Sequence, residues 1–84
     1  MKHILLVDDE RPVLDGLRCR LHGMQRQWQI DYAESGHDAL EKMGQQVYDV
    51  IVTDMRMPQM TGAQLLEIVR ARWPQTIRIV LSGY

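Results

Sequence analysis

Polar side chains suited to metal or phosphoryl chemistry follow three apolar runs of this sequence. Asp8 and Asp9 follow the run HILLV, Asp54 follows VIVT, and Ser82 follows IRIVL. Runs of this length are typical of strands buried on both faces of a parallel sheet. In an open parallel sheet, the carboxyl ends of the strands border the functional crevice. If the first and third strands are neighbours, three carboxylates therefore converge there.

Three converging carboxylates predict a divalent cation. Like charges at close range raise one another's pKa values unless a cation neutralises them. A ligand set made only of oxygen favours a hard ion such as Mg²⁺, which shares its remaining positions with water and phosphate. Ser82 would be placed to donate a hydrogen bond to a phosphoryl oxygen. Taken singly, each acid could instead be a solvated turn residue or favour the positive end of the following helix, and Ser82 could merely begin a turn.

The elements that must position these side chains alternate along the chain. Strands are expected at 3–7, 28–32, 47–53 and 77–81. The expected helices run from Pro12 to a stop at Gly23, from a cap at Ser35 to near Gly44, and from a cap at Thr61 to Trp73. This βαβαβαβ order requires right-handed crossovers and a parallel sheet with helices on both faces. The third strand should be central, the second strand more exposed, and the whole chain a single domain.

Composition narrows the class of protein. The 84 residues are 45% hydrophobic and 25% charged, which indicates one globular unit. A net charge of -1 and scattered basic residues argue against direct nucleic-acid binding. The single cysteine, Cys19, can form no internal disulfide and is expected to pack within its helix. No signal peptide or membrane-length apolar run is visible, so a cytoplasmic location is expected.

Four segments resemble the successive motifs of the receiver domain of two-component response regulators. They are LLVDDE (5–10), AESGHDAL (33–40), VIVTDMRMPQMTG (50–62) and RIVLSG (78–83). The resemblance runs through nearly the whole chain, and its acid pair, D-M-x-M-P-x-M-x-G segment and terminal hydroxyl form a specific combination. It implies a flavodoxin-like, doubly wound sheet of strand order 2-1-3-4-5, which accepts a phosphoryl group from a histidine kinase on an aspartate.

The resemblance implies a role for each matching residue. Asp54 is expected to be the phosphoacceptor. Asp9 and Asp54 are expected to bind Mg²⁺ directly, with the backbone carbonyl of Arg56 as a third ligand. Asp8 would act mainly through a metal-bound water, and Ser82 would be the switch hydroxyl that reorients toward the phosphoryl group.

The loop after the phosphoacceptor is expected to be shaped by two structural residues. Pro58 fixes φ and lacks an N–H group, while Gly62 permits a close or left-handed backbone. The three methionines of this segment are interpreted as core and loop packing rather than as partner-binding residues: Met55, Met57 and Met60.

The sequence departs from the receiver pattern after the fourth strand. Receivers have a fifth strand with a lysine that pairs with the phosphoryl group, a switch aromatic, and two further helices. The only lysines here are Lys2 and Lys42, which precede the first strand and lie on a helix, and Tyr84 comes too early to be the switch aromatic. The expectation is an incomplete flavodoxin-like fold in which residues 1–84 form the N-terminal portion of a receiver domain.

Such a truncation has two expected consequences. An uncovered edge on the fourth strand, 77–81, would invite self-association through that edge. Mg²⁺ binding would survive, but phosphorylation from a histidine kinase or phosphotransfer protein would be slow and switching impaired.

Two other classes of function compete with a phosphoacceptor module. A haloacid-dehalogenase-like, Mg²⁺-dependent phosphatase also places a nucleophilic aspartate after a parallel strand, but it needs a second aspartate where this chain has Arg56. A receiver that serves only in structure or dimerisation would keep the acids without being phosphorylated. A nucleotide-binding module is disfavoured because no glycine-rich phosphate loop follows any predicted strand.

Overall fold

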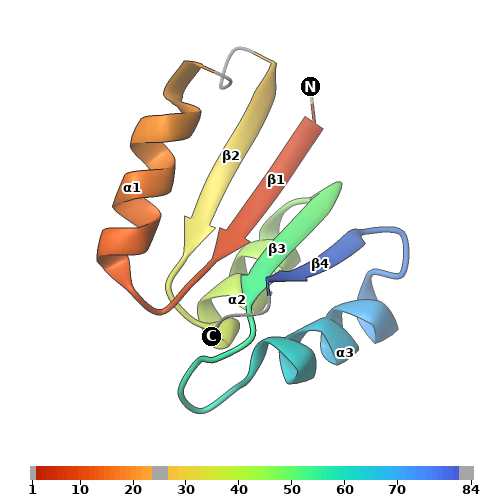
Figure 1. The fold of residues 1–84 in the computed structure, drawn as a ribbon. Coiled ribbons are helices and arrows are strands. Elements are labelled where there is room, and N and C mark those ends of the chain that lie inside the picture. The colour runs from red at the N-terminus through yellow and green to blue at the C-terminus, as the bar shows by residue number, and fades with distance from the viewer. Residues whose placement is uncertain (1, 24–26, 82–84) are drawn as a thin grey trace.

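The computed structural model describes residues 2–23 and 27–81 and forms one four-stranded parallel sheet with three helices (Figure 1). The elements are β1 (Lys2–Val7), α1 (Arg11–Leu21), β2 (Trp28–Ala33), α2 (Gly36–Gln45), β3 (Val50–Asp54), α3 (Gly62–Arg72) and β4 (Ile77–Leu81). The strand order is β2-β1-β3-β4. The predicted alternation of strands and helices is confirmed, and so is the interior position of the third strand. Ser82 and Tyr84 lie outside the described residues.

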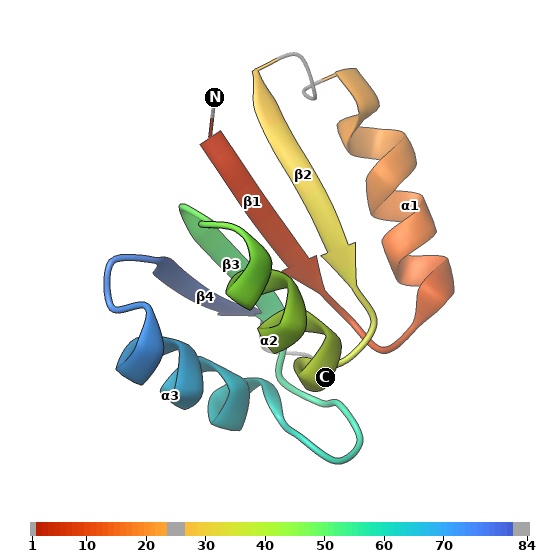
Figure 2. The ribbon, with the colours of Figure 1, turned by 180° about the vertical axis from the view of Figure 1, so that it is seen from behind.

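The reversal of strand order at β1 places the helices on two faces of the sheet. The chain moves from β1 outward to β2 through α1, and from there back across to β3 and β4 through α2 and α3. Right-handed crossovers in opposite directions put their helices on opposite faces. Figure 2 shows α2 and α3 in front of the sheet, with α1 at the side of β2. None of the described helices is long and apolar enough to cross a membrane.

The main hydrophobic core lies between the sheet and the pair α2 and α3. Alternate residues of the strands face this layer, and the two helices meet them with side chains spaced three or four residues apart. The buried members are Leu5, Val7, Ala33, Ala39, Met43, Tyr48, Ile51, Met57, Leu65 and Val69. On α1 only Leu14 is fully buried, so α1 contributes far less to the core.

Side-chain caps fix where α2 and α3 begin, as the sequence predicts. The Ser35 hydroxyl accepts a hydrogen bond from the backbone N–H of Asp38 at 3.0 Å. Thr61 and Gln64 form a capping box, in which each side chain accepts from the other residue's backbone N–H. Such caps satisfy the free N–H groups of the first turn and contribute about 1 kcal/mol each. The loops on the carboxyl side of the sheet are therefore held at their helical ends.

The structure corrects the predicted third strand. The strand was expected at 47–53, but β3 covers Val50–Asp54 and the side chain of Val47 is 75% exposed. Tyr48 turns into the core, and Asp49 accepts the backbone N–H of His3 with its carboxylate at 2.8 Å. Tyr48 is therefore buried although it lies outside β3, and its position in an apolar run does not indicate a strand.

Two expectations about exposure are also wrong. Cys19 lies exposed on α1 instead of packing within it. The more exposed strand is β4, not the second strand: Ile77 is 60% exposed and Leu81 is 55% exposed, whereas Ile30 is buried. In the described part of the chain β4 has only β3 as a neighbour. Because β2 is also an edge strand, edge position alone does not decide exposure. The strand β4 differs in that the described residues leave its apolar side chains uncovered.

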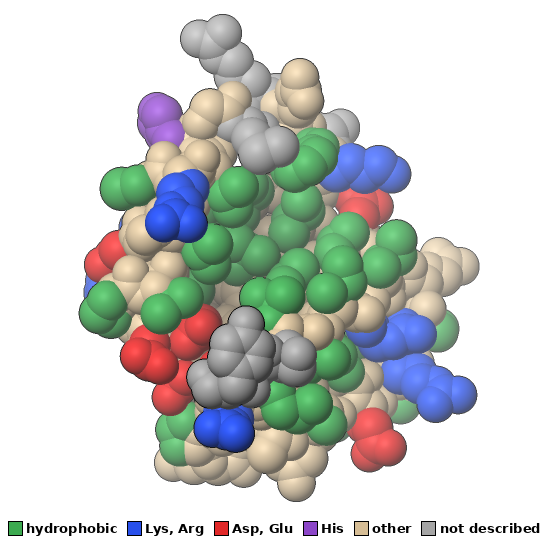
Figure 3. Space-filling model, in the orientation of Figure 1, with side chains coloured by type: hydrophobic (Ala, Val, Ile, Leu, Met, Phe, Trp, Pro, Cys, Tyr) green, Lys and Arg blue, Asp and Glu red, His purple; other side chains and the backbone are tan. Residues whose placement is uncertain are grey.

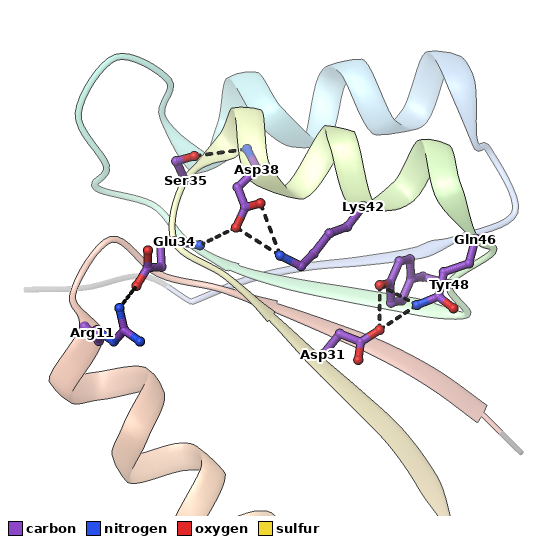
Figure 4. A network of polar contacts seen from close by, with 8 residues as sticks. All are labelled: Arg11, Asp31, Glu34, Ser35, Asp38, Lys42, Gln46 and Tyr48. Carbon is purple, nitrogen blue, oxygen red and sulfur yellow. Dashed lines mark hydrogen bonds and ion pairs between the residues drawn. The ribbon is translucent and has the colours of Figure 1, made fainter.

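A polar network closes the amino-terminal end of the core (Figure 4). The buried hydroxyl of Tyr48 donates to Asp31 at 2.6 Å, and the side-chain amide of Gln46 donates to the same carboxylate oxygen at 2.6 Å. Burial, followed by the hydrogen bond to Asp31, raises the pKa of Tyr48 to about 12. The neutral phenol is therefore the form that the folded chain stabilises.

Replacing Tyr48 by phenylalanine should reduce the free energy of unfolding by about 1 to 2 kcal/mol, because the hydrogen bond to Asp31 and the one accepted from Gln46 are both lost. The folded pKa of about 12 lies above the ordinary value of 10.0. The stabilisation from the neutral phenol is therefore complete below pH 10 and is lost as the pH rises toward 12. Urea unfolding across this interval should show a steeper alkaline loss for the wild type than for the variant. Parallel curves would contradict the assignment.

Candidate functional site

The carboxyl ends of β1 and β3 bring the predicted acids to one place. The two strands pair directly, with Val7 opposite Thr53, so the condition for convergence is met. Asp8 follows β1 immediately and Asp54 is the last residue of β3. Neighbouring strands lie about 5 Å apart, which puts the two carboxylates within reach of one another. The backbone N–H of Asp8 donates to the Ala33 carbonyl at 3.1 Å and holds the end of β1.

An acidic cluster forms directly after β1. One carboxylate oxygen from each of Asp8, Asp9 and Glu10 lies within 4.8 Å of the other two. The backbone N–H of Glu10 donates to Asp8 at 2.9 Å, which fixes this turn. Glu10 was assigned no part in the predicted metal site from the sequence. Its nearness to Asp8 depends on the turn that starts α1, for which the sequence offers no separate indication.

The charges of this cluster act on Asp8. Partial burial is the largest cause that raises the pKa of Asp8, and the negative charges of Asp54 and Asp9 raise it further. The hydrogen bond from the Glu10 backbone lowers it. Asp54 therefore belongs to the same electrostatic site as Asp8, although its oxygen atoms are not among the tight group formed by Asp8, Asp9 and Glu10.

The donor set suits a hard divalent cation such as Mg²⁺. Carboxylate oxygens that repel one another gain from a cation, and oxygen ligands are those that Mg²⁺ prefers. The carbonyl of Arg56 accepts none of the hydrogen bonds found among residues 2–23 and 27–81, so no described donor competes with a metal ion for this oxygen. Arg56 itself is exposed. Asp8, Asp9, Asp54 and Arg56 are thus chemically fit to hold the ion.

The loop between β3 and α3, residues 55–61, is closed by backbone hydrogen bonds. The N–H of Gly62 donates to the Met55 carbonyl at 2.9 Å, and the N–H of Met60 donates to the Pro58 carbonyl at 2.7 Å. Gln59, between the latter two, has φ of 70°. Sequence reasoning offered Gly62 for a close or a left-handed backbone, and the structure decides for close approach. An added Cβ at Gly62 would collide with the carbonyl of Asp54, whereas the positive φ of this loop belongs to Gln59.

Two other residues weighed from the sequence are Lys42 and Ser82. Lys42 pairs with Asp38 on α2 at 3.1 Å (Figure 4). Ser82, the expected switch hydroxyl, lies outside the described residues and its role stays a prediction.

Replacing Asp8 by asparagine is expected to raise the melting temperature of the metal-free chain by a few degrees. A raised pKa in the folded state means that stability from this group is present at low pH and lost as the pH rises through the raised value. The ionised carboxylate is therefore unfavourable at neutral pH, and the amide removes its charge while it can still accept the Glu10 N–H. Thermal unfolding with and without Mg²⁺ measures this. A lower melting temperature, or an undiminished stabilisation by Mg²⁺, would count against the electrostatic account.

Comparison with known proteins places these features in a family. The family model described as the response regulator receiver domain matches residues 4–84. The hydrogenase transcriptional regulatory protein HoxA of Cupriavidus necator is 40% identical over 81 residues, which cover 96% of this chain and 16% of that protein. The chain thus spans about a sixth of the length of this relative.

Solved structures agree with the sequence comparisons. The signal receiver domain of an HD domain-containing protein from Pseudomonas fluorescens superposes with a TM-score of 0.92 at 29% identity, covering 99% of this chain and 65% of that one. The response regulator TrrA of Thermotoga maritima superposes with a TM-score of 0.87 at 33% identity, covering 100% and 71%. It has been solved with Mg²⁺ and BeF, and also in complex with the histidine kinase ThkA. The four strands and three helices have the arrangement of this flavodoxin-like fold.

Proposed function

The chain belongs to the response regulator receiver family, and from that premise we propose that Asp54 accepts a phosphoryl group from a histidine kinase or phosphotransfer protein. The observation that carries the proposal is the placing of Asp54 at the end of a central strand, beside the acids that follow β1. A carboxylate at the end of a buried strand is held rigidly, which a nucleophile in phosphoryl transfer requires.

The proposed reaction is a displacement at phosphorus. An oxygen of the Asp54 carboxylate forms a bond to phosphorus while the bond from phosphorus to the donor nitrogen breaks, and the nitrogen keeps the electron pair. The product is an acyl phosphate. A bound Mg²⁺ would supply charge neutralisation at the transferred oxygens. Asp9 and Asp54 would hold the ion with the carbonyl of Arg56, and Asp8 would act mainly through a water bound to it.

The proposed partner follows from this chemistry. TrrA, a structural neighbour, is seen bound to a histidine kinase, which supports such a kinase as the donor for this chain. We propose a cytoplasmic location for the reaction, which is the expectation drawn from the sequence. We also propose that this segment does not bind nucleic acid directly. HoxA is named as a transcriptional regulator, but most of its length lies outside the match with this chain.

The test is direct labelling of the purified chain with acetyl phosphate, followed by intact-mass measurement. One added phosphoryl group that requires Mg²⁺ and maps to the peptide holding Asp54 is the expected result. No label under any condition would favour a receiver that serves only in structure or dimerisation. Steady hydrolysis of p-nitrophenyl phosphate would instead favour the dehalogenase-like phosphatase. Such an enzyme takes the phosphoryl group from a simple monoester and then hydrolyses its own acyl phosphate, so that it can react again.

We propose further that these residues are the N-terminal portion of a receiver domain. The similar solved chains extend beyond the match, which covers 65% of one and 71% of another. The two lysines are Lys2 and Lys42, and the latter is engaged with Asp38, so no lysine is expected to stabilise the phosphoryl group. Labelling of this chain should therefore be slow and switching impaired. Labelling at the rate of a longer form that carries the fifth strand would contradict this.

The edge of β4 supports the further proposal that the 84-residue chain associates with a second copy. Side chains on the α1 side of the sheet leave an apolar face, which Figure 3 shows as hydrophobic atoms gathered across the middle of the molecule. Ile77, Ile79 and Leu81 at its edge are exposed. Antiparallel pairing of β4 with its copy, centred on Ile79, places Ile77 opposite Leu81 and Arg78 opposite Val80. No pair of like charges then meets across the contact.

Replacing Ile79 by lysine tests this association, because a charge at the centre of the contact would meet its own copy. Sedimentation velocity should show a dimer for the wild type and a monomer for the variant. Ile79 is already exposed, so the fold should tolerate the change. A wild-type chain that sediments as a stable, cooperatively folded monomer would overturn the proposal.

A further inference from the structure

We propose that Met60 is a positioning residue, which presses the loop 55–61 onto the first residue of α2 and thereby holds the Arg56 carbonyl where Mg²⁺ needs it. The inference rests on the proposed function, because it assigns a role toward the same metal site. Met60 was interpreted from the sequence only as a packing residue.

The side chain of Met60 lies over Gly36, in the space that a Cβ at that position would enter. A Cβ added to Gly36 would lie 2.5 Å from the sulfur of Met60, 3.1 Å from its Cγ and 3.2 Å from its Cβ. Gly36 is buried, and Met60 packs against the main core while remaining half-buried itself. The thioether therefore occupies the space that a side chain at position 36 would fill. Glycine at the start of α2 leaves this space open, and a larger residue there would require the Met60 side chain to move.

The loop needs such a contact because its backbone is strained. The N–H of Met60 donates to the Pro58 carbonyl at 2.7 Å, with Gln59 between them at φ of 70°. A hydrogen bond across three residues with positive φ at the centre is a γ-turn of the rare, strained kind. A residue other than glycine keeps such a conformation only where the surrounding structure holds it. Met60 is the next residue, and its side chain supplies the hold.

The other end of the loop is fixed independently. The N–H of Met55 donates to Leu81 at 3.3 Å, and the N–H of Gly62 donates to Met55 at 2.9 Å. Arg56 lies between this fixed end and Met60, and its direct neighbour Met57 is buried in the main core. The direction of the Arg56 carbonyl therefore depends on Met57 and, through it, on Met60. Loss of the Met60 contact frees the part of the segment that follows Met57 and leaves β3 intact. Residues that orient a metal ligand without touching the ion commonly change metal affinity by about 10- to 100-fold.

Calorimetric titration of Mg²⁺ into the full chain tests the inference with binding as the readout. Met60→Ala should weaken Mg²⁺ binding by about 10-fold. Met60→Leu, which refills most of the space, should restore binding to within about 3-fold of wild type. Gly36→Ala should also weaken binding, because the new Cβ displaces the thioether, although alanine favours the helix. The double variant Gly36→Ala/Met60→Ala should be no weaker than the worse single variant, since both changes break one contact.

Met43→Ala is the matched control. Met43 is a methionine buried in the same core, on α2 and outside the loop. Its removal should lower the melting temperature and leave Mg²⁺ affinity within about 2-fold of wild type, because it lowers global stability without freeing the loop. Hydrogen exchange adds a second readout, in which the loop amides of Met60→Ala exchange faster while those of β3 do not.

The outcomes separate this inference from the function on which it rests. Mg²⁺ binding that is unchanged in Met60→Ala, or that is lost equally in Met43→Ala, would overturn the positioning role alone. A wild-type chain that binds no Mg²⁺ would overturn both. If Met60→Ala does not fold, Met60→Leu and Gly36→Ala decide the question, and unchanged binding in Gly36→Ala would count against the inference.

Discussion

Replacing Asp54 by asparagine is expected to abolish phosphoryl labelling and to leave the fold intact. The amide has no anionic oxygen to attack phosphorus, and removal of a nucleophile in covalent catalysis costs on the order of 10³-fold or more in rate. Asn has the same shape, and Asp54 is only half-buried at the end of β3, so the strand should still pair. Intact mass after treatment with acetyl phosphate and Mg²⁺ measures the label, and circular dichroism checks the fold.

Asp15→Asn is the control for that experiment. Asp15 is an exposed aspartate on α1 and is not part of the acidic cluster after β1. Its replacement makes the same chemical change away from the site and should leave labelling at the wild-type level. Equal labelling of Asp54→Asn and wild type would show that another residue accepts the phosphoryl group. The variant Asp9→Asn should bind Mg²⁺ weakly but still carry the nucleophile Asp54. Comparison of the two variants would therefore distinguish loss of the metal ion from loss of the nucleophile.

Replacing Gly62 by alanine should destabilise the chain more than Tyr48→Phe does. The added Cβ would collide with the carbonyl oxygen of Asp54 and lie 3.0 Å from the Cα of Met55. Both atoms belong to the backbone, so neither can move without shifting the end of β3. We expect a loss of about 2 to 3 kcal/mol, which corresponds to a fall of roughly 10 to 20 °C in melting temperature for a domain of this size. Thermal unfolding followed by circular dichroism measures it.

Gly44→Ala is the control for this experiment, because the same chemical change is expected to stabilise the chain there. A Cβ at Gly44 would meet nothing within 4 Å, and the residue lies within α2. Alanine there should stabilise the chain by about 0.5 to 1 kcal/mol, because it favours the helix. Similar effects of the two substitutions would mean that close approach to β3 is not what Gly62 provides. A Gly62→Ala chain that kept its stability but lost labelling would instead point to displacement of Asp54 alone.

Much of the candidate site could be predicted because it depends on local patterns. Apolar runs of strand length end at Asp8 and at Asp54, and a parallel sheet aligns such ends at one edge. The caps at Ser35 and Thr61 were predicted for the same reason, since a cap involves residues only three apart. The family resemblance then supplied the expected roles, which remain proposals for this chain.

The errors of prediction share one cause, which is dependence on distant neighbours. The apolar stretch before β3 was read as strand, but Val47 to Asp49 lie outside β3 and Tyr48 turns into the core to meet Asp31. Cys19 was expected to pack, yet α1 buries only Leu14. In each case the pattern shows that a residue is apolar, whereas the opposing surface decides whether the residue is covered.

The sequence by itself determined the order of strands and helices, their approximate limits and the acids at the strand ends. Period and capping act over a few residues, so they can be read along the chain. The family resemblance implied that β1 lies beside β3, and the tertiary structure confirms this order. Only the tertiary structure decided that Tyr48 meets Asp31 and that Met60 packs over Gly36 beside a positive φ at Gln59. These features join residues apart in sequence or impose a backbone that the residue alone disfavours, and packing of the whole chain is the physical reason they exist.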